Sequence, residues 1–296
     1  MFFSPLAYDE PLFRPPSEAR SLIFQVTTGC SWNKCAFCEM YTSKKFRVKS
    51  ENEIIREIEE ASAWFPDARK VFLADGNAMV LSSARMLTIL DKINAAFGKL
   101  ARVSAYAGAR DLQNKSEAEL RELRDAGLKL IYVGIESGDD TLLSLIGKGE
   151  TFASMEHNLL KAKSAGIKSS VMVITGLGGK VHSRSHAIAS AHLVSSVQPE
   201  FLSTLVLSFP FGLEHFKKRF GGTFIQMDRD ELLRELYLFI EHTTFDGVVF
   251  RSDHASNYLA LKGVLGRDRA RMLEEIHAAL ENPGMAALRE EWQRGL

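Results

Sequence analysis

The chain contains little cysteine and no excess of either charge, and each of these features excludes a class of protein. Cys30, Cys35 and Cys38 are the only cysteines in 296 residues, and they are too close together to form a disulfide framework. Lysine plus arginine and aspartate plus glutamate both number 37. The basic excess typical of nucleic-acid-binding proteins is therefore missing, and no nucleic-acid partner is expected.

The sequence also lacks an apolar run of about 18 residues, which a membrane-spanning helix would need. Its first twenty residues are rich in proline and do not combine a basic start with an apolar stretch, as a secretory signal does. We therefore expect no membrane contact and a cytoplasmic location, where thiols stay reduced. Residues 1–20 are predicted to form an extended arm.

The three cysteines lie within nine residues, in the pattern Cys-x4-Cys-x2-Cys. A structural zinc site uses four ligands, and most iron–sulfur clusters use four cysteines. Three cysteines suit a [4Fe–4S] cluster that keeps one iron open for a ligand from outside the protein. The alternative is a zinc site completed by His182 or His254, which is disfavoured because all three cysteines occupy one loop.

Short apolar segments alternate with amphipathic helical segments between residues 21 and 210. The predicted strands are Ser21–Thr27, Lys70–Ala74, Arg102–Ala107, Leu130–Ile135, Lys168–Ile174 and Phe201–Leu207. The first helix should begin at Ser50, because Glu53 three residues later completes a capping box. This alternation predicts an α/β fold with a parallel sheet covered by helices. In such folds the ligand site lies at the carboxyl ends of the strands.

Polar or glycine-rich residues follow most of the predicted strands. They include the cysteine loop, Asp75-Gly76-Asn77, Glu136-Ser137-Gly138 and the loop Thr175–Lys180. Each has a simpler interpretation: Asp75-Gly76-Asn77 can be a turn, Glu136 can be a buried glutamate paired with a lysine, and Thr175–Lys180 can be a tight turn. Lys44, Lys45 and Arg47 can likewise form a solvated basic patch.

A three-cysteine loop after the first strand of a six-unit βα chain resembles the radical S-adenosylmethionine (SAM) superfamily. The family signature is Cys-x3-Cys-x2-Cys, and this chain has one extra residue between Cys30 and Cys35. The stretch YVGIESGDD and the pair Lys148-Gly149 are similar to the oxygen-independent coproporphyrinogen III oxidase-like group. The resemblance implies a partial (β/α)6 barrel of the TIM type over 21–210, with 211–296 as a C-terminal helical cover of the same domain.

The resemblance also implies cofactors and their contacts. Cys30, Cys35 and Cys38 would hold one [4Fe–4S] cluster, and SAM would bind its open iron. Positions that match SAM-contacting motifs of the family, or that could face its carboxylate, are Phe37, Arg47, Asp75, Gly76, Asn77, Glu136, Ser137 and Ile174. The match after the fifth strand is partial, because Met172 and Gly179 replace a glycine and a glutamate of the family pattern.

The C-terminal segment 250–259 concentrates polar side chains, including Asp253 and His254. It can be a capped turn, or a substrate lid in which Asp253 or His254 takes part in catalysis. The other histidines on predicted helices, His157, His186 and His192, are expected on the surface.

The functional expectation is a radical SAM enzyme, an oxidoreductase that cleaves SAM to a 5′-deoxyadenosyl radical and abstracts hydrogen from a small or medium-sized substrate. The resemblance implies an external electron donor such as flavodoxin or ferredoxin. With no further cysteines, a second cluster is excluded. The alternative from a different class is a carrier that binds haem or another tetrapyrrole on the same fold without turnover.

Overall fold

A computed structural model describes residues 6–295, so the first five residues of the predicted arm lie outside the described part. The chain divides into two compact units. Unit 1 comprises residues 1–33, 38–133 and 158–169, and unit 2 comprises 34–37, 134–157 and 170–296. Strands β6 (Leu128–Glu136) and β7 (Lys168–Thr175) and helix α5 (Phe152–Ser164) contribute residues to both units. The division into arm, core and cover expected from the sequence stays a prediction.

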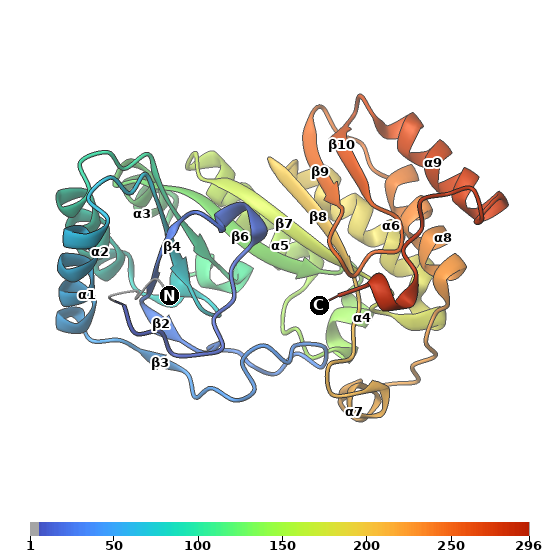
Figure 1. Ribbon diagram of the computed structural model, residues 1–296, viewed down its shortest axis with the longest axis horizontal. Helices are drawn as coiled ribbons and strands as arrows, with labels where there is room; N and C mark the ends of the chain where they lie inside the picture. The colour runs from blue at the N-terminus through green and yellow to red at the C-terminus, as the bar shows by residue number, and fades with distance from the viewer. Residues whose placement is uncertain (1–5, 296) are drawn as a thin grey trace. The chain divides into compact units, whose positions relative to one another are not determined.

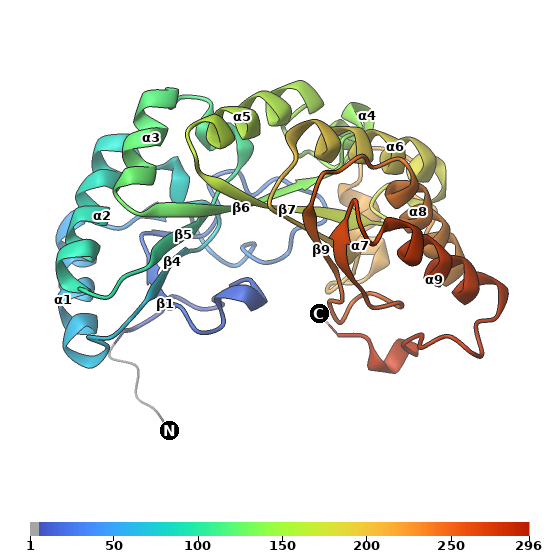
Figure 2. The ribbon, with the colours of Figure 1, turned by 90° about the horizontal axis from the view of Figure 1, so that it is seen from above.

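Unit 1 is built on parallel strands in the order β1 (Leu22–Gln25), β4 (Lys70–Ala74), β5 (Arg102–Tyr106) and β6. Helices α1 (Glu51–Trp64), α2 (Ser83–Ala96) and α3 (Glu117–Asp125) lie along one face of these strands (Figure 2). Short 3-10 helices η2 (Ala78–Val80) and η3 (Ala109–Leu112) follow β4 and β5. The predicted strands of this unit and the predicted start of its first helix are confirmed.

Helix α1 starts where the sequence predicts it. The Ser50 side chain accepts the backbone N–H of Glu53, and the Glu53 carboxylate accepts the N–H of Ser50. This reciprocal capping satisfies two N–H groups that a helix start leaves without partners. Ile54, Ile58 and Ala61 then fall on one buried face.

The opposite face of the unit 1 strands carries the predicted arm. Tyr8 and Leu12 pack there on an apolar cluster that includes Phe72 and Tyr132. The 3-10 helix η1 (Pro16–Glu18) ends on fully buried Glu18, whose carboxylate accepts hydrogen bonds from Tyr132 and Arg102 at 2.6 Å each. The described part of the arm is therefore packed on the sheet by apolar contacts and one buried ion pair.

A two-stranded antiparallel sheet closes the cysteine loop. Strand β2 (Thr27–Thr28) pairs with β3 (Arg47–Val48), Thr27 opposite Val48 and Thr28 opposite Arg47. The 18 residues between these strands include all three cysteines. The pairing fixes both ends of the loop at the carboxyl end of β1.

The strands of unit 2 are β7, β8 (Phe201–Val206), β9 (Val248–Ser252) and β10 (Leu261–Leu265). β7, β8 and β9 run parallel, whereas β10 is antiparallel to β9. Helices α6 (Gly179–Val197), α8 (Arg229–Glu241) and α9 (Arg269–Glu281) line one side of these strands (Figure 1). The remaining helices are α4 (Asp140–Leu145), α7 (Leu213–Arg219) and the 3-10 helix η4 (Glu291–Gln293).

Two features of unit 2 differ from expectation. The C-terminal segment adds strands β9 and β10 to the sheet, so it is not only a helical cover. Strand β10 was missed because its five residues include Gly263 and show no clear alternation of apolar and polar side chains. The prediction that His186 lies on the surface is wrong: its side chain is buried, because it faces the sheet from α6.

No helix in the described part of the chain has the length and hydropathy that a membrane span requires.

Candidate cofactor site

The three cysteines lie in the loop between β2 and β3. Cys30 and Cys38 belong to unit 1 and are partly exposed, whereas Cys35 belongs to unit 2 and is buried. None of the three forms a disulfide bond. Among residues 6–295 no group of three or more His, Cys, Asp or Glu side chains is arranged to hold a metal ion. The assignment of the cysteines to a cluster therefore stays a prediction, supported by the chemistry of three cysteine side chains in one loop.

Asp75 is fully buried directly after β4, and its carboxylate is hydrogen-bonded through both oxygens. Oδ2 accepts the backbone N–H of Gly29 at 2.8 Å and lies 3.0 Å from Lys44 Nζ. Oδ1 accepts the side-chain amide of Gln25 at 3.2 Å. Lys44 is itself almost completely buried. Asp75 is thus an anchor for the first turn of the cysteine loop, with Lys44 as its counter-charge.

Gly76 brings the chain after β4 into direct backbone contact with Cys30. Its N–H donates to the carbonyl of Gly29 at 3.0 Å. A Cβ atom at position 76 would lie 2.4 Å from Cys30 Cα and 2.5 Å from Cys30 Cβ, a distance that no packed structure tolerates. Only glycine allows this approach.

Asn77 holds the other side of Cys30. Its side-chain oxygen accepts the N–H of Ser31 at 3.1 Å, and its amide nitrogen donates to Ser31 Oγ at 2.7 Å and to Asp111 at 3.0 Å. Burial raises the pKa of Asp111, and the bonds from Gly108 N–H and Asn77 oppose that rise. Asp75, Gly76 and Asn77 together clamp the backbone on both sides of Cys30.

Between Cys30 and Cys35 the backbone changes direction at Asn33. Asn33 has a φ of +45°, a left-handed conformation that asparagine adopts more readily than most residues. Its side-chain amide donates to the carbonyl of Tyr41 at 3.0 Å. The neighbouring Trp32 ring is stacked by Arg110, whose guanidinium carbon is 3.7 Å from the ring centroid.

In unit 2 the short segment 34–37 is tied to the chain after α4 and to α7. The Ala36 N–H donates to the carbonyl of Ile146 at 2.8 Å, and Arg219 donates to the carbonyl of Cys35 at 2.8 Å. The ring of Phe37 has Lys148 Nζ at 5.9 Å from its centroid. The backbone around Cys35 is therefore fixed by its own set of hydrogen bonds.

Glu136 ends β6 as a buried carboxylate with one oxygen free. Its Oε1 pairs with Lys148 Nζ at 3.1 Å, whereas Oε2 is buried without a hydrogen-bond partner among the described residues. The side chain folds back over Gly134, where a Cβ would meet Oε1 at 2.0 Å. Glu136 has a φ of +65°, a strained conformation for a non-glycine residue. A buried unpaired oxygen is costly, and it is the observation that fits a polar group of a bound cofactor.

Ser137 and Ile174 meet through His186 of α6. The Ile174 carbonyl accepts a hydrogen bond from His186 Nε2 at 3.0 Å, and Nδ1 lies 2.8 Å from Ser137 Oγ. Because a carbonyl only accepts, Nε2 carries a proton in this contact. Sequence reasoning missed His186, since a lone histidine on a helix shows no signal of burial.

Glu235 of α8 reaches the loop after β7. Its Oε1 accepts the N–H of Gly176 at 2.6 Å, and its Oε2 is buried without a partner among the described residues. Burial raises the pKa of this carboxyl group, and nearby His186, Ser183 and Gly176 partly oppose the rise. No local sequence pattern indicates a role for Glu235, because it lies on a helix 59 positions after its partner.

Arg47 and the polar segment 250–259 make hydrogen bonds and ion pairs within the protein itself. Arg47 is exposed on β3 and pairs with Glu53 at 3.2 Å. His254 Nδ1 accepts the N–H of Ser256 at 3.1 Å, and burial and Arg289 lower the pKa of this histidine while Asp253 raises it. Arg289 also donates to the backbone carbonyls of Asp253 and His254. These bonds favour the capped turn over the lid, and the catalytic role of Asp253 and His254 stays a prediction.

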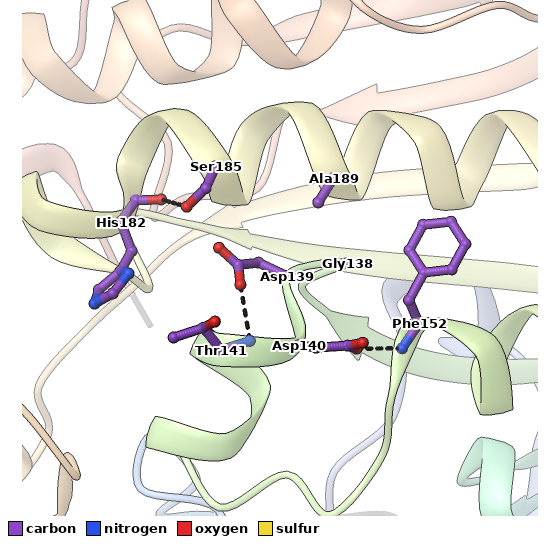
Figure 3. A pocket seen from close by; sticks show the side chains of 8 residues that line it. All are labelled: Gly138, Asp139, Asp140, Thr141, Phe152, His182, Ser185 and Ala189. Carbon is purple, nitrogen blue, oxygen red and sulfur yellow. Dashed lines mark hydrogen bonds between the residues drawn. The ribbon is translucent and has the colours of Figure 1, made fainter.

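A groove of about 630 Å³ lies beside the starts of α4 and α6, lined by residues that include Asp139, Asp140 and His182 (Figure 3). Its polar groups bond within the groove walls: Asp139 accepts the N–H of Thr141, and Asp140 accepts the N–H of Phe152. These bonds cap and connect helices, and the groove therefore adds no candidate for chemistry.

Comparison with known proteins assigns the class. The family model of the radical SAM superfamily matches residues 24–190, more than half of the chain. The chain therefore belongs to the radical SAM superfamily.

Individual relatives are distant. The chain is 24% identical over 152 residues to the haem chaperone HemW of Bacillus subtilis (strain 168), a match that covers 51% of this chain and 39% of that protein. It is similar in structure to the radical SAM enzyme coproporphyrinogen III oxidase (HemN) from Escherichia coli, with a TM-score of 0.57 and 14% identity over 75% of this chain and 52% of that one. It is also similar to methylornithine synthase (PylB), with a TM-score of 0.52 and 17% identity over 91% and 83% of the two chains.

These matches confirm the predicted fold class, an α/β fold of the partial TIM-barrel type, and the resemblance to the coproporphyrinogen III oxidase-like group. The match spans 39% of the haem chaperone and 52% of the oxidase.

Proposed function

We propose that the protein is a radical SAM enzyme in which Cys30, Cys35 and Cys38 hold a single [4Fe–4S] cluster. When bound, the cluster would pass one electron from a reduced donor such as flavodoxin or ferredoxin to SAM, whose C5′–S bond breaks to give methionine and a 5′-deoxyadenosyl radical. That radical would take a hydrogen atom from a small or medium-sized substrate and become 5′-deoxyadenosine. The proposed location is the reducing cytoplasm, where cysteines outside disulfide bonds stay as thiols.

The observation that supports this function best is the clamp of Asp75, Gly76 and Asn77 on both sides of Cys30. A cluster ligand needs a backbone held in one position, and groups around metal ligands supply that order. In this proposal Asp75 and Asn77 orient the cysteine loop through their side chains. Any contact of Gly76 with SAM would come from its backbone.

In this proposal Glu136 is one of the residues that bind SAM. Its buried Oε2 has no partner among the described residues, and a hydroxyl or ammonium group of SAM would satisfy it. Phe37, Ser137 and Ile174 are proposed as further parts of this site, with Ser137 and Ile174 held by His186. Arg47, which is exposed and paired with Glu53, has less support as a SAM contact.

The test is anaerobic reconstitution with iron and sulfide, followed by incubation with SAM and dithionite. We expect about four iron atoms per chain and formation of 5′-deoxyadenosine. The Cys38→Ala variant should lose both, whereas Gly98→Ala should keep both, because a Cβ at position 98 meets nothing within 4 Å.

A second candidate is a tetrapyrrole carrier, favoured by the sequence match to the haem chaperone HemW. It predicts tight binding of haemin by the reconstituted protein with no 5′-deoxyadenosine above the Cys38→Ala background. That combined result would overturn the enzyme proposal.

A further inference from the structure

A second cavity, of about 310 Å³, lies in unit 2 at the carboxyl ends of two strands. Gly176 follows β7, and Val206 ends β8; both line the cavity. Its volume is at the lower end of the range of about 300–1,000 Å³ for small-molecule pockets. The carboxyl ends of parallel strands are where α/β folds bind ligands.

Aromatic rings line this cavity, and a further ring outside the lining packs against them. Phe209 and Phe224 line it, together with Met227 and Leu232. The ring of Phe216 lies outside the lining and packs against both phenylalanines, with centroids 5.3 Å from Phe209 and 4.7 Å from Phe224 in edge-to-face geometry. The apolar surface is therefore formed before any ligand binds, which suits a flat ring that stacks or meets ring edges.

The charged groups at the cavity are already paired with one another or with neighbours. Arg294 pairs with Glu291 at 2.8 Å and stacks on the ring of Tyr258 at 3.9 Å. Arg229 pairs with Asp230 at 2.9 Å. With two acidic and two basic residues in the lining, Asp228, Glu291, Arg229 and Arg294, the wall is neutral in sum. A charged ligand would find no unpaired side chain of opposite charge here.

Two hydrogen-bonding groups also line the cavity. The Tyr258 hydroxyl donates to Glu291 at 2.7 Å, and burial with this bond raises the pKa of Tyr258 to about 12, so the phenol stays neutral. Gln226 is exposed, and its side-chain amide has no hydrogen bond to the described residues. A polar group on the ligand therefore has one neutral amide to meet.

We propose that this cavity binds the substrate through an uncharged aromatic group, with a hydroxyl, carbonyl or amide of the substrate bonded to Gln226. This inference rests on the proposed function and names the class of substrate. Haem and related tetrapyrroles carry carboxylates on a far larger ring system, and the cavity has neither the volume nor an unpaired cation for them.

The test uses the purified full chain without SAM, so that binding is measured apart from turnover. The probe is 2-naphthol, an uncharged bicyclic ring with one hydroxyl, titrated by calorimetry or by its own fluorescence. 2-Naphthoate is the charged analogue, and naphthalene lacks the hydroxyl. We expect one 2-naphthol site, and affinity for 2-naphthoate weaker by about tenfold because burying an unpaired charge is unfavourable.

Two variants locate the site. Phe224→Ala should weaken 2-naphthol binding about tenfold by removing an aromatic wall. The matched control is Phe201→Ala on β8, whose ring does not line the cavity and which should bind as the unaltered chain does. Gln226→Ala changes an exposed side chain and should weaken 2-naphthol about threefold but leave naphthalene binding unchanged.

Equal binding of 2-naphthol by Phe224→Ala and Phe201→Ala would overturn the proposal, as would binding of 2-naphthoate as tight as that of 2-naphthol. If 5′-deoxyadenosine forms and these binding results fail, the enzyme stands and the substrate class is wrong. If the binding results hold and 5′-deoxyadenosine does not form, the cavity is supported and the radical chemistry is overturned.

Discussion

Buried carboxylates in the two units differ in how completely their oxygens are hydrogen-bonded. In unit 1, both oxygens of Asp75 are used, by Gln25, Gly29 and Lys44. In unit 2, Glu136 and Glu235 are equally buried, yet each leaves Oε2 without a partner among the described residues. A carboxylate satisfied by the protein itself fixes a backbone, whereas one left half-satisfied has capacity for something that is not protein.

Carboxylates that hold the fold and carboxylates that bind a ligand should therefore differ in what their substitution changes. Removing a fully bonded carboxylate should damage the fold and the cysteine loop together. Removing a half-bonded one should leave stability nearly unchanged and affect ligand binding or pH dependence. Three carboxylate substitutions below test that difference, and Gly76→Ala tests the contact with the cysteine loop; the four are given from the largest expected effect to the smallest.

Asp75→Ala should produce the largest loss. It leaves Lys44 buried without a counter-charge and the Gly29 N–H without an acceptor, at a cost of about 3–5 kcal/mol in the free energy of unfolding. Iron content after reconstitution should fall as well. Urea unfolding and iron analysis measure both quantities. The double variant Asp75→Ala with Lys44→Met should recover part of the stability and none of the iron; full recovery of both would contradict the anchoring role.

Gly76→Ala should come second. Its Cβ would lie 2.4 Å from Cys30 Cα, so the β4 loop and the cysteine loop must move apart. We expect about 1–3 kcal/mol of destabilisation, as for overpacking, and loss of cluster incorporation. The matched substitution Gly98→Ala meets no atom within 4 Å and should change stability by less than about 1 kcal/mol. Equal iron content in the two variants would refute the close contact as a requirement.

Glu136→Gln should separate binding from stability. Glutamine keeps an acceptor for Lys148 and removes a buried charge with a free oxygen. Stability should stay within about 1 kcal/mol, while SAM affinity should fall about tenfold through loss of a charge-assisted hydrogen bond. Equilibrium dialysis with SAM gives the affinity. Glu60→Gln, an exposed change on α1, should leave it unchanged, and an equal loss there would rule out a specific role for Glu136.

Glu235→Gln should have the smallest effect at acid pH and a growing one above it. The pKa of Glu235 is raised in the folded chain, mainly by burial. A raised folded pKa means that its stabilising contribution is complete below the unfolded pKa of about 4.5 and is lost as pH rises through the folded value. Relative to the variant, the unaltered chain should therefore become less stable as pH rises.

Urea unfolding of both proteins between pH 4.5 and 8 measures this difference. Glu231→Gln, at a half-buried position of the same helix, would lose the ion pair with Lys180 and weaken the capping of Asp228, and should give a constant offset instead of a slope. A flat difference between the unaltered chain and Glu235→Gln would show that the carboxyl group does not change protonation on folding.

Much of the fold could be read from local patterns. The six strands, the capping of α1 by Ser50 and Glu53, and the polar loops after the strands depend on residues close together in the chain. Strand β10 and the burial of His186 could not be predicted. A short strand with a central glycine shows no clear strand pattern, and a lone histidine on a helix gives the same sequence signal whether it is buried or exposed. The role of Glu235 depends on a partner 59 residues away.

By itself the sequence determined the class of this protein: three clustered thiols after the first strand of a βα alternation, which the family match confirms. Only the tertiary structure decided how the polar residues after the strands are used. Asp75 and Asn77 bond to the cysteine loop, and Glu136 keeps a buried oxygen without a partner among the described residues. The backbone at positions 75 and 136 is in the left-handed region. The contacts that hold this region, such as Gly76 against Cys30, join segments far apart in the chain, and no pattern of neighbouring residues encodes them.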